Sequence, residues 1–248
     1  MKMIKNIFIC WFQGFNNAPE IVQQCLRSWI YYNSTTWNII KLDNSNLGEY
    51  INMDEFADPQ ISKNHLSDII RIMILNRYGG VWVDATTFCN RALDEWLDPY
   101  TRSGFFAFER PNNEILIASW FMYSEPGNYI TSEWEKITLE AFKKNNQPVY
   151  LIIHYLFNHL YNNDQKFRKL FDTMPKAPSN LSNNGVGPHF IQTVGIFNNI
   201  TDGLISYIQA KMTPLFKLTH KCDFQNEYND KTIVHYLFST IAQLIDNQ

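Results

Sequence analysis

Residues 67–86 read SDIIRIMILNRYGGVWVDAT, and the rest of the fold can be worked out from this segment. Its first part belongs to a helix that starts near residue 62, because apolar side chains recur there on one face: Leu66, Ile69, Ile70, Met73 and Ile74. The glycine pair at 79–80 ends this helix at about residue 78. Residues 81–84 then predict a short buried strand whose last residue is Asp84.

The residues before this segment also alternate between strand and helix. Residues 4–12 are rich in β-branched and aromatic side chains and predict the first strand. We expect a helix from residue 19, since Pro19 suits the first helical position and Glu20 places an acid in the first turn. Residues 37–42 predict a second strand, closed by the turn-rich residues 43–46. This β-α-β opening favours an α/β domain with a parallel sheet.

Beyond residue 84, the pattern predicts strands over residues 105–108 and 115–123 and helices over 129–144 and 149–161. The last of these helices is apolar nearly all round, which is typical of a core helix and also compatible with docking on a membrane surface. Residues 172–188 are rich in Pro, Asn, Ser and Gly and predict a long loop that can serve as a lid. No repeat or linker divides the chain.

The composition excludes several classes of protein. Of the 248 residues, 45% are hydrophobic and 18% are charged, which supplies a core and rules out wholesale disorder. A formal net charge of −3 argues against general nucleic-acid binding. Aromatic residues make up 15%, more than we expect a core of this size to need, and spare aromatics often line sites for sugars or nucleotide rings.

The cysteines and the N-terminal residues bear on location. The four cysteines lie far apart without a CxxC pair, as is typical of buried thiols in a reducing compartment. The apolar run at residues 7–12 is too short for a signal sequence or a membrane span. We therefore expect a cytoplasmic protein.

Three charged residues of the central segment are candidates for chemistry. Asp68 and Arg71 are three residues apart on the helix face opposite the apolar stripe, where the plain interpretation is a surface ion pair. Asp84 ends a strand, and open α/β sheets bind their ligands at the carboxyl ends of strands. A carboxylate there suits a divalent cation that bridges two phosphates.

The central segment also resembles the sugar-donor motif of the capsular polysaccharide synthesis proteins, a bacterial branch of the glycosyltransferase 32-like group. That group is related to the sugar-transferring domains of large clostridial toxins. Weaker matches extend over nearly the whole chain: CWFQG at 10–14 with Ala18-Pro19 after it, FFAF at 105–108, SWF at 119–121, HYLF at 154–157 and KLTHK at 217–221.

The resemblance implies a fold and an activity. The fold is GT-A, a Rossmann-like nucleotide-sugar-binding α/β fold, here with additional C-terminal helices. It forms a single domain, with a donor-binding half at about residues 1–125 and a helical acceptor or lid part at about 126–248. The implied activity is retaining transfer of a hexose from a UDP-sugar, with glucose or galactose expected. The acceptor is a lipid-linked oligosaccharide precursor of a surface or capsular polysaccharide, so a peripheral contact with the inner face of the plasma membrane is expected.

Two other functions stay open. One is a nucleotide-sugar-binding protein that has lost catalysis, and the other is a transferase that moves a sugar-phosphate. The sequence has no P-loop, zinc-protease, nucleophile-elbow or dinucleotide-binding motif.

Carried over residue by residue, the resemblance implies a donor site made of Trp11, Phe12, Ser67, Asp68, Arg71, Trp82, Asp84, Lys217 and Lys221. Trp11 is similar to the aromatic that stacks on the donor base, and a buried core tryptophan is the alternative. Asp68 and Arg71 resemble the pair that holds the donor sugar and its diphosphate. Together with Asp84, the first acid of the DxD motif, they are the expected catalytic residues.

One departure from the family pattern concerns the metal. The DxD motif reads Asp84-Ala85-Thr86 in this chain, so a hydroxyl replaces the second carboxylate. One option is Mn²⁺ or Mg²⁺ held by Asp84, Thr86, the diphosphate and a C-terminal ligand, His220 or Asp223. A lone histidine such as His220 is more often structural.

The other option is charge compensation by Arg71 and the lysines. Lys217 and Lys221 flank the C-terminal motif and can neutralise a leaving diphosphate, unless they are two solvated surface lysines.

The remaining histidines give weaker signals. His154 and His159 are five residues apart, not the four that place two metal ligands on one helix face, so we expect core or partner contacts. His189 ends the flexible loop, where it is either an ordinary loop residue or a contact to donor or acceptor.

Overall fold

The computed structural model describes residues 3–52, 61–109, 113–144, 148–180, 187–189, 191 and 195–247. At its centre lies a five-stranded sheet. Its strand order is β2 (Asn38–Leu42), β1 (Asn6–Cys10), β3 (Gly80–Asp84), β6 (Ile117–Ser124) and β5 (Phe105–Glu109). The first three strands are parallel, which confirms the predicted β-α-β opening. β6 runs antiparallel to both β3 and β5, so the sheet as a whole is mixed.

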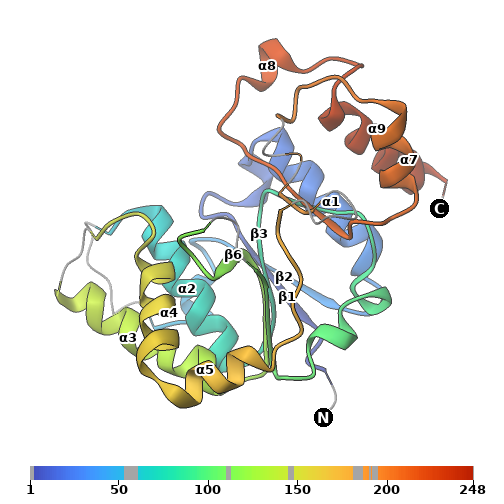
Figure 1. Cartoon of the computed structure of the whole chain (residues 1–248). Coiled ribbons are helices and arrows are strands. Elements are labelled where there is room, and N and C mark those ends of the chain that lie inside the picture. Colours follow the sequence, from blue (N-terminus) through green and yellow to red (C-terminus); the bar gives the residue numbers. More distant parts are fainter. Residues whose placement is uncertain are drawn as a thin grey trace.

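Helices cover both faces of the sheet (Figure 1). On one side, α2 (Lys63–Tyr78), α3 (Tyr129–Lys144), α4 (Ile152–Asn163) and α5 (Gln165–Asp172) pack in sequence, each against the next. On the other side, α1 (Glu20–Asn33) packs against α9 (Ile233–Asp246), near α7 (Asp202–Gln209) and α8 (Phe224–Glu227). These layers confirm the predicted Rossmann-like α/β fold with additional C-terminal helices.

Two helices differ from their predicted form. α1 begins at Glu20, because Pro19 has an extended backbone and precedes the first turn instead of starting it. α4 is not buried all round: Ile153, Phe157 and Leu160 form a buried face, whereas Tyr155 is exposed. Its apolar composition therefore does not reflect a fully buried core helix.

α2 is positioned by its two ends. At the first, the Ser62 hydroxyl accepts a hydrogen bond from the backbone N–H of His65 and caps the helix. At the second, Gly79 and Gly80 have φ angles of 65° and 97°, which favour glycine. A Cβ at Gly80 would lie 2.5 Å from the carbonyl oxygen of Asn6, so only glycine lets β3 approach β1 this closely.

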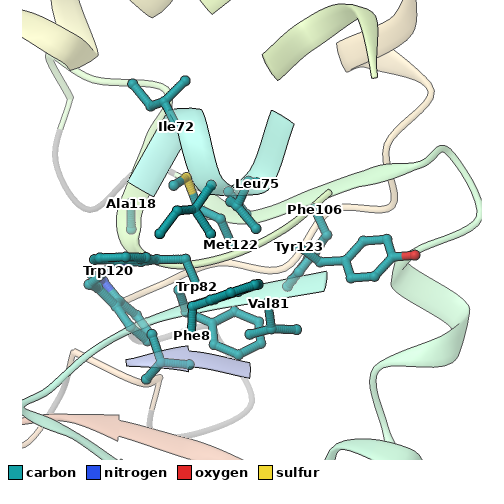
Figure 2. Close-up of a cluster of buried hydrophobic side chains, with 14 of the residues drawn as sticks. Phe8, Ile72, Leu75, Val81, Trp82, Phe106, Ala118, Trp120, Met122 and Tyr123 are labelled. Carbon is teal, nitrogen blue, oxygen red and sulfur yellow. The ribbon is translucent and has the colours of Figure 1, made fainter. Parts of the chain in front are cut away.

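The main core includes residues from both faces of the sheet and from α2, and Figure 2 shows a part of it. Its labelled members come from α2 and all the central strands: Phe8, Ile72, Leu75, Val81, Trp82, Phe106, Ala118, Trp120, Met122 and Tyr123. Large aromatic side chains such as Trp29, Trp82 and Trp134 are almost fully buried. Core packing therefore uses more of the aromatic side chains than the composition led us to expect.

A second, two-stranded sheet joins the C-terminal part to the end of β3. It pairs β4 (Thr87–Cys89) with β7 (Leu215–Lys217), and the backbone N–H of Leu218 donates to the carbonyl of Thr86 at 2.8 Å. A separate apolar cluster, built mainly from α9 and the residues around β7, supports this sheet. The pairing brings residues 217–221 beside residues 84–86.

The predicted loop lid is described only in part, because residues 181–186 lie outside the described residues. Before them, the chain pairs with the end of β5: the Glu109 N–H donates to the Ala177 carbonyl, and the Ser179 N–H donates to the Glu109 carbonyl. All four cysteines are free thiols. Within the described ranges, no helix has both the length and the apolar character needed to cross a membrane.

Candidate functional site

A pocket of about 370 Å³ lies at the carboxyl ends of β1 and β3 and is bordered by α2 and the residues after β7. This is the edge at which parallel strands present ligand sites. Its lining consists of Cys10, Trp11, Phe12, Gln13, Lys63, Asn64, Ser67, Asp68, Arg71, Trp82, Asp84, Ala85, Thr86, Tyr150, Lys217, Thr219, His220 and Lys221. All the residues predicted to bind the donor lie in it, together with two of the predicted metal ligands, Thr86 and His220.

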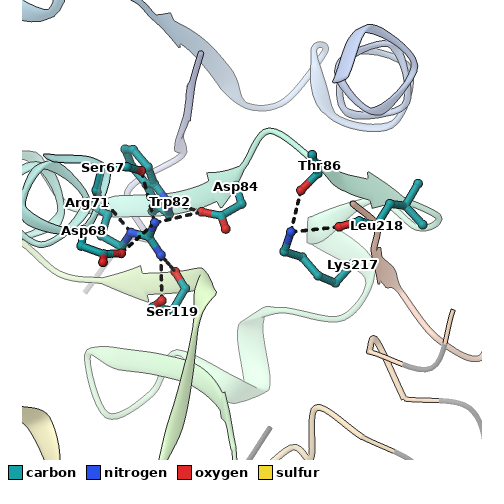
Figure 3. A network of polar contacts seen from close by, with 9 residues as sticks. All are labelled: Ser67, Asp68, Arg71, Trp82, Asp84, Thr86, Ser119, Lys217 and Leu218. Carbon is teal, nitrogen blue, oxygen red and sulfur yellow. Dashed lines mark hydrogen bonds and ion pairs between the residues drawn. The ribbon is translucent and has the colours of Figure 1, made fainter. Parts of the chain in front are cut away.

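Arg71 is the centre of a buried polar network (Figure 3). One terminal nitrogen lies 3.1 Å from Asp68 Oδ1 and 3.3 Å from Asp84 Oδ1. The other donates to the carbonyl and hydroxyl oxygens of Ser119 at 3.0 and 2.7 Å. Asp68 and Arg71 are only 8% and 6% exposed, and Arg71 lies against β3 and β6 through its contacts to Asp84 and Ser119. The interpretation of this pair as a surface ion pair is therefore wrong.

The remaining donors of Arg71 are also used within the protein. Its Nε donates to the carbonyl of Ser67, and the terminal nitrogen that faces Asp68 and Asp84 also donates to the hydroxyl of Ser67, both at 3.2 Å. A guanidinium has five N–H groups, and here they face six acceptors. Arg71 therefore contributes its charge to the pocket but has its hydrogen-bonding capacity filled.

The network shifts the titration of its members. Burial alone would raise the pKa of Asp84, but the charges of Arg71 and Lys217 outweigh it and hold this pKa below its usual range. Burial would lower the pKa of Arg71, yet Asp84 and Asp68 raise it. For Asp68, burial prevails over Arg71 and raises the pKa to about 7. Asp84 is thus the firmly ionised carboxylate of the pocket.

Lys217 lies on the opposite side of Asp84 from Arg71 (Figure 3). Its Nζ donates to Thr86 Oγ1 at 2.5 Å and to the carbonyl of Leu218 at 3.0 Å. Burial lowers the pKa of Lys217, and the charge of Asp84 opposes this shift. The Thr86 hydroxyl, which stands in the second DxD position, therefore faces an ammonium group.

The aromatic residues of the pocket differ in exposure. Trp82 is 1% exposed and donates from Nε1 to Asp84 Oδ1 at 3.2 Å, so it holds the carboxylate and offers little ring surface. Trp11 is half-buried and packs edge-on against the ring of His220, with centroids 5.2 Å apart. Of the two, Trp11 is the one able to stack on a ligand.

The candidate metal ligands of the pocket do not suit a divalent cation. Mn²⁺ and Mg²⁺ prefer several oxygen ligands around one point. Among the described residues, no three or more His, Cys, Asp or Glu side chains are grouped so as to hold a metal. Asp84 Oδ1 is paired with Arg71, the Thr86 hydroxyl accepts from Lys217, and His220 is exposed. The other predicted C-terminal ligand, Asp223, caps α8 and is not part of the lining.

The charges of the pocket favour an anionic ligand. The lining carries four cationic side chains, which are Lys63, Arg71, Lys217 and Lys221, against two carboxylates, Asp68 and Asp84. Lys63 and Lys221 are exposed. Lys217 is more buried, so its charge is less screened by solvent. A ligand with two or more negative charges suits this surplus.

Two histidines outside the lining lie near the same charges. His154 Nδ1 is buried without a hydrogen-bond partner among the described residues, and burial together with the charge of Arg71 lowers its pKa to about 4. The ring of His189 lies against Trp120 with centroids 5.3 Å apart, and burial lowers its pKa to about 4. His159, in contrast, is exposed. His154 is thus partly buried, whereas for the exposed His159 the predicted alternative, a contact to a partner, stays a prediction.

The family of the protein follows from a comparison over its whole length. A family model described as capsular polysaccharide synthesis protein matches residues 1–237, a range that includes the entire pocket. The chain belongs to this family. The resemblance inferred from the central segment is thereby confirmed.

The chain is also similar to curated proteins and to solved structures that are named as glycosyltransferases. It is 27% identical over 162 residues to the O-glycosyltransferase braB of Annulohypoxylon truncatum and 25% identical over 155 residues to the glycosyltransferase afumC of Aspergillus fumigatus. The matches cover 56% and 54% of this chain but only 37% and 39% of those proteins.

The glycosyltransferase GlyE of Streptococcus pneumoniae, in its apo form, has a similar structure, with a TM-score of 0.56 over 99% of this chain and 63% of that one. At 7% identity, this likeness concerns the fold alone. It confirms the predicted GT-A fold.

Several residues of the pocket and of the Arg71 network were not predicted from the sequence. Lys63 lies one helical turn before Ser67 on α2, so helical spacing would have placed it in the site. Ser119 belongs to the SWF motif but had no assigned role. Tyr150 precedes α4 and reaches the pocket through the packing of helices, which no local pattern reveals.

Proposed function

We propose that the protein is a glycosyltransferase that moves a hexose from a UDP-sugar, with glucose or galactose as the sugar, to a precursor of a surface or capsular polysaccharide. The proposal is supported by membership of the family and by the glycosyltransferase relatives. The observation that carries it is the placement of Asp84 between Arg71 and Lys217, in a pocket with surplus positive charge at the carboxyl end of β3.

The pocket suits the three parts of such a donor. The half-buried ring of Trp11, with Phe12 next to it, offers a stacking surface for the base. The cationic side of the pocket, at Lys217 and Lys221, suits the diphosphate. Ser67 and Asp68 offer hydroxyl and carboxylate groups of the kind that bind sugar hydroxyls.

In the proposed reaction, the bond between the anomeric carbon and the diphosphate oxygen breaks, and the electron pair leaves with UDP. A hydroxyl of the acceptor forms the new bond from the same face, and its proton passes to the departing phosphate oxygen. The task of the protein is then to orient the donor and to stabilise the charge that develops on the diphosphate. Retention follows from attack on the same face and rests on the family.

The proposed acceptor is a lipid-linked oligosaccharide at the inner face of the plasma membrane. An exposed apolar surface at the start of α4 supports this choice, because Val149, Tyr150 and Tyr155 are 61%, 66% and 41% exposed. Tyr150 also lines the pocket, so this surface adjoins the donor site. Aromatic side chains of this kind suit a lipid–water boundary.

A second candidate is a nucleotide-sugar-binding protein without catalysis, which the hydroxyl of Thr86 in the DxD-like motif favours. One experiment separates the two. The protein is incubated with a panel of UDP- and GDP-sugars, with and without Mn²⁺, and released nucleotides are resolved by chromatography. We expect UDP from one sugar, whereas tight binding without release identifies a binding protein. Release of UMP would instead identify transfer of a sugar-phosphate.

The matched variants are Asp84→Asn and Asp230→Asn. Asp84→Asn removes the charge between Arg71 and Lys217, and we expect UDP release to fall to background. Asp230 is exposed and lies outside the pocket, so its variant should keep wild-type turnover. Near-normal turnover in a folded Asp84→Asn protein would contradict the site.

A further inference from the structure

Lys217 lies beside both positions of the DxD-like motif. Its ammonium contacts the Thr86 hydroxyl at 2.5 Å, and its charge acts on Asp84, which is the other position. In a DxD motif, these two positions would be expected to face a divalent cation. Here they face the side chain of a residue on β7, which backbone pairing with β4 holds in place.

The two cationic side chains next to Asp84 differ in how many N–H groups remain available to a ligand. Arg71 directs its five N–H groups to six acceptors within the protein. The Lys217 ammonium has three N–H groups, of which two are accounted for by Thr86 and Leu218. Among the described residues, the third has no partner. Lys217 lines the pocket, so this donor is available to a ligand.

A bound anion would also stabilise the charge of the partly buried Lys217 ammonium. The Lys217 side chain is partly buried, and loss of water disfavours its charged form. The Asp84 carboxylate offsets this only in part, because it is shared with Arg71 and with Trp82 Nε1. A diphosphate at Lys217 would supply the missing counter-charge.

We propose that the ammonium of Lys217 replaces the divalent cation, so that this enzyme binds the diphosphate of its donor without a metal. This inference rests on the proposed function, since it takes a nucleoside diphosphate as the ligand. Asp84 then serves to hold Lys217 and Arg71 in place, and Thr86 orients the ammonium where a second carboxylate would neutralise it. The role of Lys217 explains why the candidate metal ligands of the pocket do not suit a divalent cation.

The test is calorimetric titration of the full chain with UDP, and in parallel with GDP, in excess EDTA and in excess Mn²⁺. We expect UDP to bind with the same affinity in both, within about twofold. Lys217→Met should weaken binding in EDTA by on the order of 10- to 100-fold, the effect of losing one charge-assisted hydrogen bond. Mn²⁺ should not restore it. Lys231→Met, an exposed lysine outside the pocket, is the control and should bind like the wild type.

A second variant keeps the test decisive if Lys217→Met fails to fold. Thr86→Asp completes the DxD motif and neutralises Lys217, so we expect at least a tenfold loss of UDP affinity in EDTA and recovery on addition of Mn²⁺. Unchanged affinity of this variant in EDTA would overturn the role of Lys217.

The two proposals fail in different ways. Wild-type binding of UDP that requires Mn²⁺ would overturn metal independence and leave the proposed function intact. Absence of UDP and GDP binding in both buffers would overturn both, because the ammonium would then have no nucleoside diphosphate to hold.

Discussion

Replacing Arg71 by Met tests whether the buried network also supports the fold. The substitution leaves the carboxylates of Asp68 and Asp84, each within 3.3 Å of the guanidinium, without their shared cation and removes two hydrogen bonds from Ser119. Breaking a buried ion pair costs about 3–5 kcal/mol. We expect the lower end, about 3 kcal/mol, because Asp68 already has a pKa raised to about 7 and can take up a proton. At about 2–4 °C per kcal/mol for a chain of this size, the melting temperature should fall by roughly 6–12 °C.

The assay is thermal unfolding followed by circular dichroism, with Arg77→Met as the matched control. Arg77 is also on α2, but its side chain is 31% exposed and lies 4.0 Å from Glu135, so its loss should cost less than about 1 kcal/mol. Removing Arg71 raises the pKa of Asp68 further, so the deficit of Arg71→Met should be larger above pH 7, where the wild type keeps the ion pair, than at lower pH, where Asp68 is protonated in both proteins. Equal shifts for the two variants, or a deficit that does not change with pH, would refute the reasoning.

Three further predictions concern separate parts of the molecule. Gly80→Ala should destabilise the protein by at least about 3 kcal/mol, since the added Cβ would lie 2.5 Å from the Asn6 carbonyl oxygen and residue 80 has a φ of 97°. A loss of less than about 1 kcal/mol in the free energy of unfolding by urea would contradict this. The pKa of His154 is lowered to about 4, so protonation of the unfolded chain should remove up to about 3 kcal/mol of the free energy of unfolding as the pH falls from 6.5 to 4. His154→Gln should flatten this decline, and an unchanged dependence of stability on pH in the variant would contradict the prediction. Trp11→Leu should weaken UDP binding about 5- to 100-fold with little change in melting temperature; equal affinity would exclude stacking on the base.

The sequence predicted the central elements because their patterns are local. The apolar stripe of α2, the glycine pair and the apolar run of β3 each depend on neighbouring residues, and all three appear where expected. The parallel pairing of β1 with β2 and β3 follows from the same alternation. The family resemblance predicted more of the donor site than the hydrophobic patterns did, since all the donor-site residues that it named line one pocket.

What the patterns missed depends on contacts between distant segments. The burial of Asp68 and Arg71 goes with contacts of Arg71 to Asp84 on β3 and Ser119 on β6, and a helical period cannot report this. β4 and β7 have three residues each, too few for a strand pattern, yet their pairing brings Lys217 to Thr86. The cationic environment of the DxD-like motif therefore became visible only in three dimensions.

The most direct test of the account is a crystal structure of the protein with UDP, grown in EDTA. The account predicts the diphosphate in the pocket with an oxygen about 3 Å from Lys217 Nζ, and the uracil ring against Trp11. UDP bound away from this pocket, or a diphosphate out of reach of Lys217, would contradict it.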